Sequence, residues 1–255
     1  MKKLLFLTMA ALLATACQKK ADTTNALTTE NTTQDPSSGE STSPANSLDA
    51  PAGAPIEVSF TGGIDPKNYT PEQEATVSIN RFPNNLNEWK ELQKQIGNRP
   101  EGAVMLQLAA FELYYRHTEA GTEAIKLGNV ESNVNSVLRI ICDKFGKTQY
   151  NDQFMPYLIG SFLEGAEPTN AYNPNKPYTI RVRTHPAHDY ERSEMLKGYV
   201  LYLQVYSSGY DTPWRGCDVI KQKGNEFYTV NNCPSMYTGC KDIDFECDDE
   251  YHGLD

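Results

Sequence analysis

The spacing of hydrophobic residues divides the chain into two halves with different periods. From about residue 85 to residue 145, apolar side chains recur every three or four positions, which is typical of amphipathic helices. From about residue 178 to residue 230, they alternate with polar side chains or form short β-type runs, which indicates strands. Helices followed by antiparallel strands predict an α+β fold, with a helical first half packed on a C-terminal antiparallel β-sheet.

The first half predicts three helices. The first begins after Asn85, which forms a pattern resembling a capping box with Glu88, and it ends at Gly97. The second covers residues 101–118 and has so little polar surface that we expect it to be the central buried helix. The third covers residues 132–145 and is amphipathic.

The second half predicts short strands joined by turns. It opens with an apolar segment, residues 155–162, in which Pro156 is a candidate helix start. Gly224 and Asn225 at a tight turn predict a hairpin between the last two strands. Together with two strands before the helices, the predicted strands are residues 56–60, 75–82, 178–183, 199–206, 217–220 and 227–230.

The first seventeen residues resemble the start of a bacterial lipoprotein. Lys2 and Lys3 precede an apolar run, residues 4–13, which is too short for a spanning helix of about 20 residues. Small residues then lead to Cys17, as in the lipobox of bacterial lipoproteins, with Ala14 where leucine is usual. The resemblance implies cleavage before Cys17, a diacylglyceryl group on its thiol, and an acyl chain such as palmitate on the new amino group.

The same resemblance implies a location. Gln18 rather than aspartate follows the cysteine, which in a Gram-negative envelope implies sorting to the outer membrane. Two or three acyl chains hold a protein on a bilayer stably, whereas one does not. The alternative is an ordinary secreted protein with a cysteine at the cleavage site by chance.

Composition sets the expected domain limits. We expect a signal peptide at residues 1–16 and a disordered, Ser/Thr-rich tether at residues 17–55, where large apolar side chains are almost absent. A recognition or O-glycosylated segment is the alternative for the tether. A single α+β domain covers residues 56–240, and all fifteen tyrosines follow residue 68. Residues 241–255 form an acidic tail.

The charge of the chain limits its partners. The formal net charge is −10, and no basic stripe is visible, which argues against nucleic acid. It also argues against electrostatic adhesion to anionic lipid, so the N-terminal lipid is the expected membrane contact. No phosphate loop, dinucleotide fingerprint or Gly-x-Ser-x-Gly elbow is present, and no cofactor is predicted.

Two separated motifs carry a likeness to a known family. The first runs Phe162-Leu163-Glu164-Gly165-Ala166 and continues to Pro168 and Asn170, and the second runs Ser207-Ser208-Gly209-Tyr210-Asp211-Thr212-Pro213. Over residues 85–240 the chain resembles an uncharacterised family of bacterial domains of unknown function. The resemblance implies a helical first half and a β-rich second half, and it implies no chemistry. Trp214 stands between Pro213 and Arg215, whereas in the family the arginine usually follows the proline directly.

One short segment has the residue types of a metal site. His185, His188, Asp189 and Glu191 could hold zinc, and an open coordination position could then activate water for a metal-dependent hydrolase. Pro186 breaks any helix here, so the spacing does not bring both imidazoles to one face. The alternative interpretation is a surface loop between two strands.

The turn of the second motif is a candidate binding site. Ser208, Asp211, Trp214 and Arg215 follow a strong strand, and exposed aromatic and arginine residues anchor partners such as an envelope protein or a glycan. The alternative interpretation is turn chemistry, because Ser, Gly, Asp and Pro are the residues of tight turns.

Five cysteines follow Cys17. Export permits disulfides, and the hairpin places Cys217 nearly opposite Cys233, although that bridge needs a β-bulge. The second predicted pair is Cys240–Cys247. Cys142 lies in an apolar helix and is expected to be a buried thiol.

Three functions remain open at the level of sequence. The leading hypothesis is a lipid-anchored envelope protein whose domain binds or scaffolds without catalysing a reaction. The second is the metal-dependent hydrolase of the His185/His188 loop. The third is a small-ligand-binding α+β cone, which predicts a concave pocket with a few convergent polar groups.

Overall fold

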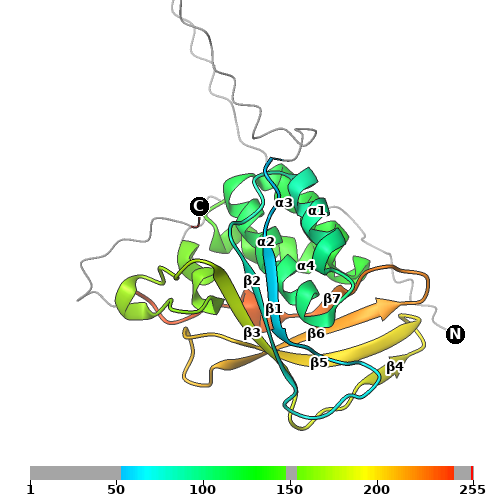
Figure 1. Cartoon of the computed structure of the whole chain (residues 1–255). Coiled ribbons are helices and arrows are strands. Elements are labelled where there is room, and N and C mark those ends of the chain that lie inside the picture. Colours follow the sequence, from blue (N-terminus) through cyan, green and yellow to red (C-terminus); the bar gives the residue numbers. More distant parts are fainter. Residues whose placement is uncertain (1–52, 148–153, 244–253, 255) are drawn as a thin grey trace, which may run out of the picture. The chain divides into compact units, whose positions relative to one another are not determined.

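The structure, a computed structural model, describes residues 53–147 and 154–243 together with Leu254 (Figure 1). The predicted signal peptide, Cys17 and nearly all of the predicted tether lie outside the described residues, as do Cys247 and most of the acidic tail. Those predictions are therefore not tested by the fold.

All described strands form one antiparallel sheet. The strand order is β1-β2-β3-β5-β6-β7, and the short β4 pairs with β5 beside β3. The strands are β1 (Val58–Gly62), β2 (Glu74–Ile79), β3 (Tyr178–Thr184), β4 (Glu191–Ser193), β5 (Gly198–Tyr206), β6 (Trp214–Gln222) and β7 (Thr229–Asn232).

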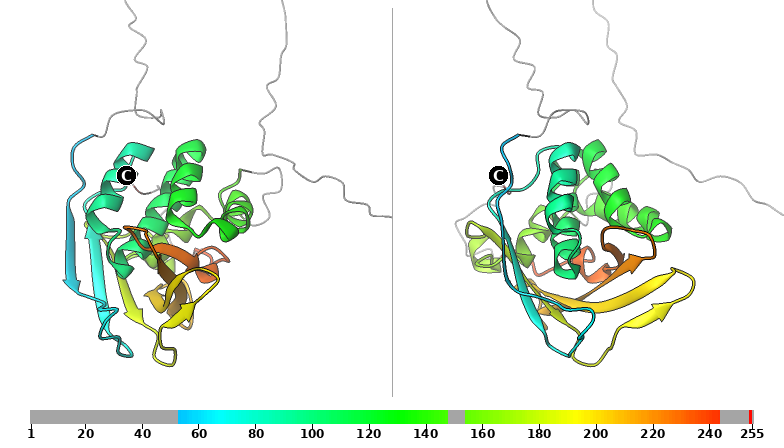
Figure 2. Two further views of the ribbon diagram at one scale, coloured as in Figure 1. Left: turned by 90° about the vertical axis from the view of Figure 1, so that its right-hand side faces the viewer. Right: turned by 45° about the vertical axis from the view of Figure 1, so that its right-hand side comes forward.

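The helices precede most of the sheet in sequence and lie on one of its faces (Figure 2). They are α1 (Leu86–Ile96), α2 (Pro100–Arg116), α3 (Thr118–Gly128) and α4 (Glu131–Lys144). Short 3-10 turns follow at η2 (Pro156–Leu158), η3 (Gly160–Phe162), η4 (Pro168–Asn170) and η5 (Pro234–Met236). The predicted α+β fold, with helices first and an antiparallel sheet after them, is confirmed.

Helix α2 is the centre of the helical layer. Every residue from Pro100 to Tyr114 is buried, and the helix packs against α1 and α3 and against strands β2, β3, β6 and β7. This is the arrangement that an all-round apolar helix predicts. Helix α1 has the predicted cap, because the Asn85 side chain accepts a hydrogen bond from the backbone N–H of Glu88 at 2.9 Å.

One helix lies outside the three predicted ranges. Helix α3 occupies residues between the second and third predicted helices, where Gly121 and Gly128 lower the helix propensity of the sequence. Its packing on α2 outweighs this low propensity, which is only a weak guide. In the apolar segment after α4, the candidate helix start at Pro156 begins the 3-10 turn η2, and η3 follows it.

The last hairpin carries the predicted disulfide. The register shifts between Asp218 and Val219, so that Asp218 pairs with Asn232 while Val219 pairs with Val230. This bulge brings Cys217 beside Cys233, and the two form a disulfide, as predicted. Cys240 is a free cysteine among the described residues and Cys247 lies outside them, so the Cys240–Cys247 pair stays a prediction.

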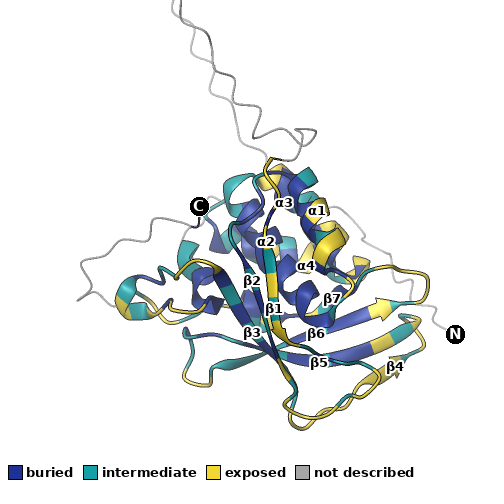
Figure 3. Cartoon of the chain, viewed as in Figure 1, coloured by how far each residue is buried: buried dark blue, intermediate teal, exposed yellow. Residues whose placement is uncertain are grey.

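The sheet has one covered face and one open face (Figure 3). In β3, the buried Tyr178, Ile180 and Val182 face the helices, and the alternate positions are half-buried on the other side. On that outer face Arg183 lies over the Trp214 ring, with 4.2 Å between the guanidinium carbon and the ring centroid. Functional side chains can therefore come from either face of the same strands.

A buried carboxylate makes stability depend on pH. Glu112 of α2 is fully buried beside Arg116, and burial raises the pKa of its carboxyl from 4.5 to about 7 although Arg116 opposes the shift. Below pH 4.5 the carboxyl is protonated in both the folded and the unfolded chain, and its contribution to stability is fully present. As the pH rises to about 7, the unfolded chain loses this proton first, so the contribution is lost.

We expect Glu112→Gln to remove this loss, which is roughly 3 kcal/mol for a shift of this size. Urea unfolding of the parent and the variant at pH 4.5 and pH 8 measures it. Glu123→Gln is the matched control, because Glu123 is only partly buried and pairs with Lys126 on the surface of α3. An equal fall in stability for the parent and Glu112→Gln would contradict the assignment.

Candidate ligand-binding pocket

The sheet extends past the helices at one end. In Figure 1, the start of β5, the end of β6 and the short β4 reach beyond the helical layer, and the second view of Figure 2 agrees. Residues there point to the helix side of the sheet but have no helix above them. Tyr199 is 51% exposed, for example, whereas Leu203 on the same strand and the same face is fully buried.

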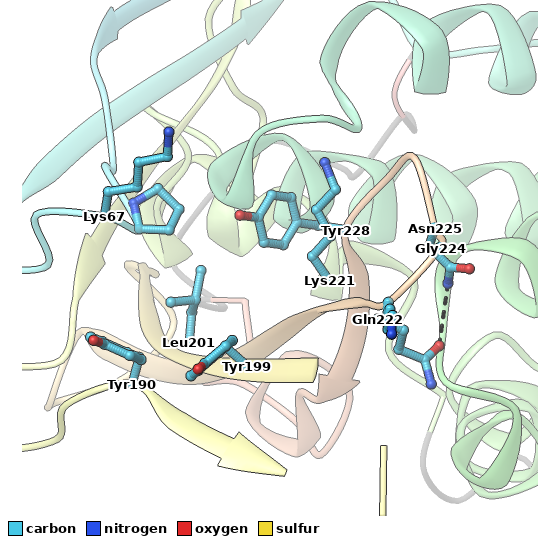
Figure 4. A pocket seen from close by; sticks show the side chains of 11 residues that line it. Lys67, Tyr190, Tyr199, Leu201, Lys221, Gln222, Gly224, Asn225 and Tyr228 are labelled. Atoms are coloured by element: carbon cyan, nitrogen blue, oxygen red, sulfur yellow. Dashed lines mark hydrogen bonds between the residues drawn. The ribbon is translucent and has the colours of Figure 1, made fainter. Parts of the chain in front are cut away.

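A pocket of about 500 Å³ fills the space that the helices leave open (Figure 4). Its floor is the β5–β6 pair, in which Tyr199 lies opposite Lys221 and Leu201 lies opposite Val219. Its walls come from the β1–β2 loop, the segment before β4 and the β6–β7 hairpin. The lining residues are Pro66, Lys67, Tyr190, Tyr199, Leu201, Lys221, Gln222, Lys223, Gly224, Asn225 and Tyr228.

The back wall is held by the helical layer. The backbone N–H of Tyr228 donates to the carbonyl oxygen of Gly97, which follows α1, at 2.7 Å. The Tyr228 ring is buried beside the pocket, and the ammonium of Lys221 lies 5.5 Å from its centroid. Burial raises the pKa of the Tyr228 hydroxyl, so it stays protonated and can donate a hydrogen bond.

Three tyrosines stand together at the opposite rim. The Tyr190 ring packs edge-to-face on Tyr199, with 5.6 Å between centroids, and lies 5.9 Å from Tyr69. The Tyr69 hydroxyl donates to the carbonyl oxygen of Tyr202 in β5 at 2.8 Å, which ties the β1–β2 loop to the sheet. Tyr190 is 44% exposed, so this rim presents aromatic surface that the fold holds in place.

The pocket is basic although the chain is acidic. Lys67, Lys221 and Lys223 line it, and no lining residue is a carboxylate. The nearby Asp65 is engaged in its own turn, where it accepts hydrogen bonds from the backbone of Lys67 and the side chain of Asn68. The lining itself therefore carries positive and no negative side chains in a chain whose formal net charge is −10, while Asp65 and Glu101 lie close enough to raise the pKa of the Tyr228 hydroxyl.

The family comparison assigns most of this chain to one domain. The family described as Domain of unknown function (DUF6935) matches residues 81–244. The chain belongs to this family. The comparisons with curated proteins and with solved structures each found no match. The resemblance to an uncharacterised domain family is thus confirmed.

The DUF6935 match does not cover the whole fold. It begins after β1 and β2, so Pro66 and Lys67 of the pocket precede it, and the other lining residues lie within it. In the part of the chain that the structure describes, no helix is long and apolar enough to cross a membrane.

The predicted metal segment is a surface loop on the DUF6935 domain. The rings of His185 and His188 lie 4.3 Å apart, but Glu191 accepts a hydrogen bond from the Tyr202 hydroxyl at 2.7 Å and Asp189 caps the next backbone N–H. His185 Nδ1 accepts from the backbone of Ala187. Among residues 53–147 and 154–243, no group of three or more His, Cys, Asp and Glu could hold a metal ion.

The four residues predicted to bind at the second motif do not converge. Trp214 lies on the outer face of the sheet beside Arg183, whereas Arg215, its neighbour in β6, stacks on Tyr210 at 4.0 Å. Asp211 is exposed and pairs with Lys241 at 2.6 Å. Consecutive residues of a strand point to opposite faces, so the sequence cluster is divided in space.

The two sequence motifs meet and hold each other instead. The Ser207 hydroxyl and the Ser208 backbone N–H both donate to the carbonyl oxygen of Ser161, at 2.9 Å each. The Ser208 hydroxyl donates to the carbonyl oxygen of Ala166. Gly209 permits the close approach, because a Cβ there would lie 3.1 Å from the Ser161 Cβ. These hydrogen bonds hold the second motif against the first.

Sequence patterns did not point to the pocket residues. In the sequence, Tyr199 and Tyr190 have the pattern of ordinary strand and loop residues. Lys221 and Lys223 have the pattern of polar residues next to a hairpin turn. The usable signal is that Lys221 falls on the inward-facing register of β6, two residues after the buried Val219. A lysine in that register indicates that the covered face ends there.

Proposed function

We propose that the chain is a lipid-anchored envelope protein whose DUF6935 domain binds a small ligand in the β5–β6 pocket. The observation that carries the proposal is the pocket itself: a concave space of about 500 Å³ beyond the edge of the helical layer. Ligand sites are typically clefts of this size, lined by aromatic side chains with a few polar groups.

The lining favours binding over catalysis. It combines three tyrosines with lysines and side-chain amides, and it holds no Ser, Cys, His, Asp or Glu to act as nucleophile or general base. This lining supports the binding role in the leading hypothesis from the sequence, and the pocket supports the small-ligand site of the third hypothesis. The lipobox and the Ser/Thr-rich tether support placement of this pocket at an envelope membrane.

Filling the pocket tests the binding site. We expect Leu201→Trp to block it, because the indole would extend from the floor into the open volume. The measurement is two-dimensional NMR of the ¹⁵N-labelled chain with a chemically diverse set of small compounds. In the parent chain, compounds should shift the amides of Tyr199, Lys221 and Tyr228, and Leu201→Trp should weaken these shifts at least tenfold.

Leu127→Trp is the matched control, since Leu127 is 43% exposed on α3 and outside the pocket lining. It should leave the binding unchanged. The amide spectrum of each variant also checks that the fold persists. Compounds that shift only amides elsewhere, or that bind Leu201→Trp as well as the parent, would overturn the proposal.

The lipid anchor has its own test. We expect mass spectrometry of protein extracted from its native membrane to find a diacylglyceryl group on Cys17. Cys17→Ser should leave the leader uncleaved at this position and the protein without the lipid mass. Cys240→Ser, a cysteine of the folded domain, should keep the lipid. An unmodified parent protein cleaved at another position would contradict the anchor.

A further inference from the structure

We infer that the pocket takes an acidic saccharide, a sugar ring that carries a carboxylate or a phosphate. The inference rests on the proposed binding function and adds the chemical class of the ligand. Three properties of the lining support this ligand class: its charge, its exposed rings and its unused hydrogen-bonding groups.

The charge of the lining selects an anion. Lys67 of the β1–β2 loop, Lys221 of β6 and Lys223 of the hairpin all line the pocket, and Figure 4 labels the first two. None of the three forms an ion pair with a carboxylate among the described residues. A carboxylate or phosphate would be attracted by three ammonium groups, whereas a cation would be repelled.

The exposed rings select a ligand with a flat, ring-sized face. Tyr199 and Tyr190 pack edge-to-face, which leaves ring surface of each open at the rim. The buried Leu201 lies beside Tyr199 on the floor, and the buried Tyr228 stands across the space from these residues, as Figure 4 shows. The volume of about 500 Å³ has room for a six-membered ring, and tyrosine combines an apolar face with a polar tip that suits hydroxyl-bearing ligands.

The unused polar groups select hydroxyls. Among the described residues, the hydroxyls of Tyr190, Tyr199 and Tyr228 take part in no hydrogen bond, and the side-chain oxygen of Asn225 is likewise unused. A sugar would satisfy these donors and acceptors. A purely apolar ligand would leave three ammonium groups and three hydroxyls covered without partners, which is costly.

Paired probes on the full chain test the ligand class. Isothermal titration with digalacturonic acid, an acidic disaccharide, should give binding at least tenfold tighter than maltose, a neutral disaccharide of similar size. Lys221→Gln combined with Lys223→Gln should weaken digalacturonic acid at least tenfold and leave maltose unchanged. Lys126→Gln, a surface lysine of α3 paired with Glu123, is the control and should change neither affinity.

Further arms separate the sources of the anion. Glucose 6-phosphate should bind more tightly than inorganic phosphate, because the pocket would contact its sugar ring as well as its phosphate. Equal binding of the two phosphates, or of digalacturonic acid and maltose, would overturn the acidic saccharide. So would binding only to phosphatidylglycerol vesicles, which would assign the lysines to a lipid surface. These results would contradict only the ligand class. Whether small ligands bind in the pocket at all is tested separately by Leu201→Trp.

Discussion

Alanine in place of Gly121 is expected to lower the free energy of unfolding by about 3 kcal/mol or more. Helix α3 crosses α2 at this glycine, and a Cβ at residue 121 would lie 2.1 Å from the Cα of Tyr114 and 2.2 Å from its backbone nitrogen. Both atoms belong to the backbone of the central helix, so neither can move without displacing α2. The clash must exceed the roughly 1 kcal/mol that alanine gains over glycine in a helix.

Urea unfolding of Gly121→Ala and Gly216→Ala provides the comparison. Gly216 lies in β6, and a Cβ there would meet no atom within 4 Å. Its replacement should leave stability unchanged or raise it slightly, because alanine restricts the unfolded chain. If both variants unfold at the same urea concentration as the parent, α3 does not pack on α2 at this distance.

Loss of the Cys217–Cys233 bridge is expected to cost about 3 kcal/mol. The two cysteines are 16 residues apart, and a closed loop of that length restricts the unfolded chain by about this amount. Both side chains are buried, so paired replacement by alanine also removes packing around the bulge. The double variant Cys217→Ala/Cys233→Ala should therefore unfold at a clearly lower temperature than the parent.

A reductant separates the bridge from the packing. It should lower the melting temperature of the parent by much more than that of the double alanine variant, which lacks Cys217 and Cys233. Replacing the other described cysteines, Cys142 and Cys240, should not abolish the response to reductant, because neither belongs to this bridge. A parent chain whose melting temperature is insensitive to reductant would contradict a stabilising disulfide.

The sequence predicts the elements whose local signals agree with their surroundings. Helix α1 has a cap at Asn85 and a stop at Gly97, and α2 is apolar on every side, so both are visible without a structure. The bulge at Asp218 can be predicted by counting residues back from the hairpin turn, because Cys217 and Cys233 lie opposite each other only if one strand has an extra residue. In each case a short-range pattern is sufficient, since the partners are near in sequence or the burial is uniform.

The features that were missed depend on distant residues. Helix α3 has two glycines that lower its helix propensity, and it packs on α1, α2, α4 and β7, contacts that no local pattern reports. The pocket requires knowing where the helical layer ends above β5 and β6. Likewise, Trp214 and Arg215 are adjacent in sequence yet lie on opposite faces of the sheet. The predicted binding cluster rests on neighbouring positions in the sequence. The alternation of side chains along the strand places these neighbours on opposite faces of the sheet.

The path of the chain through the sheet has a consequence for folding kinetics. The chain leaves the sheet at Ile79, forms helices α1 to α4 and rejoins the sheet at Tyr178, which pairs directly with Ile79. Pairing of β2 with β3 therefore closes a very long loop. The conformational entropy of that loop must be lost before the strand contacts can stabilise the sheet. Helices and the β5–β6 hairpin need only nearby partners. The β2–β3 pair should consequently be the last part of the sheet to form. Mutations in this pair should therefore mainly change the unfolding rate.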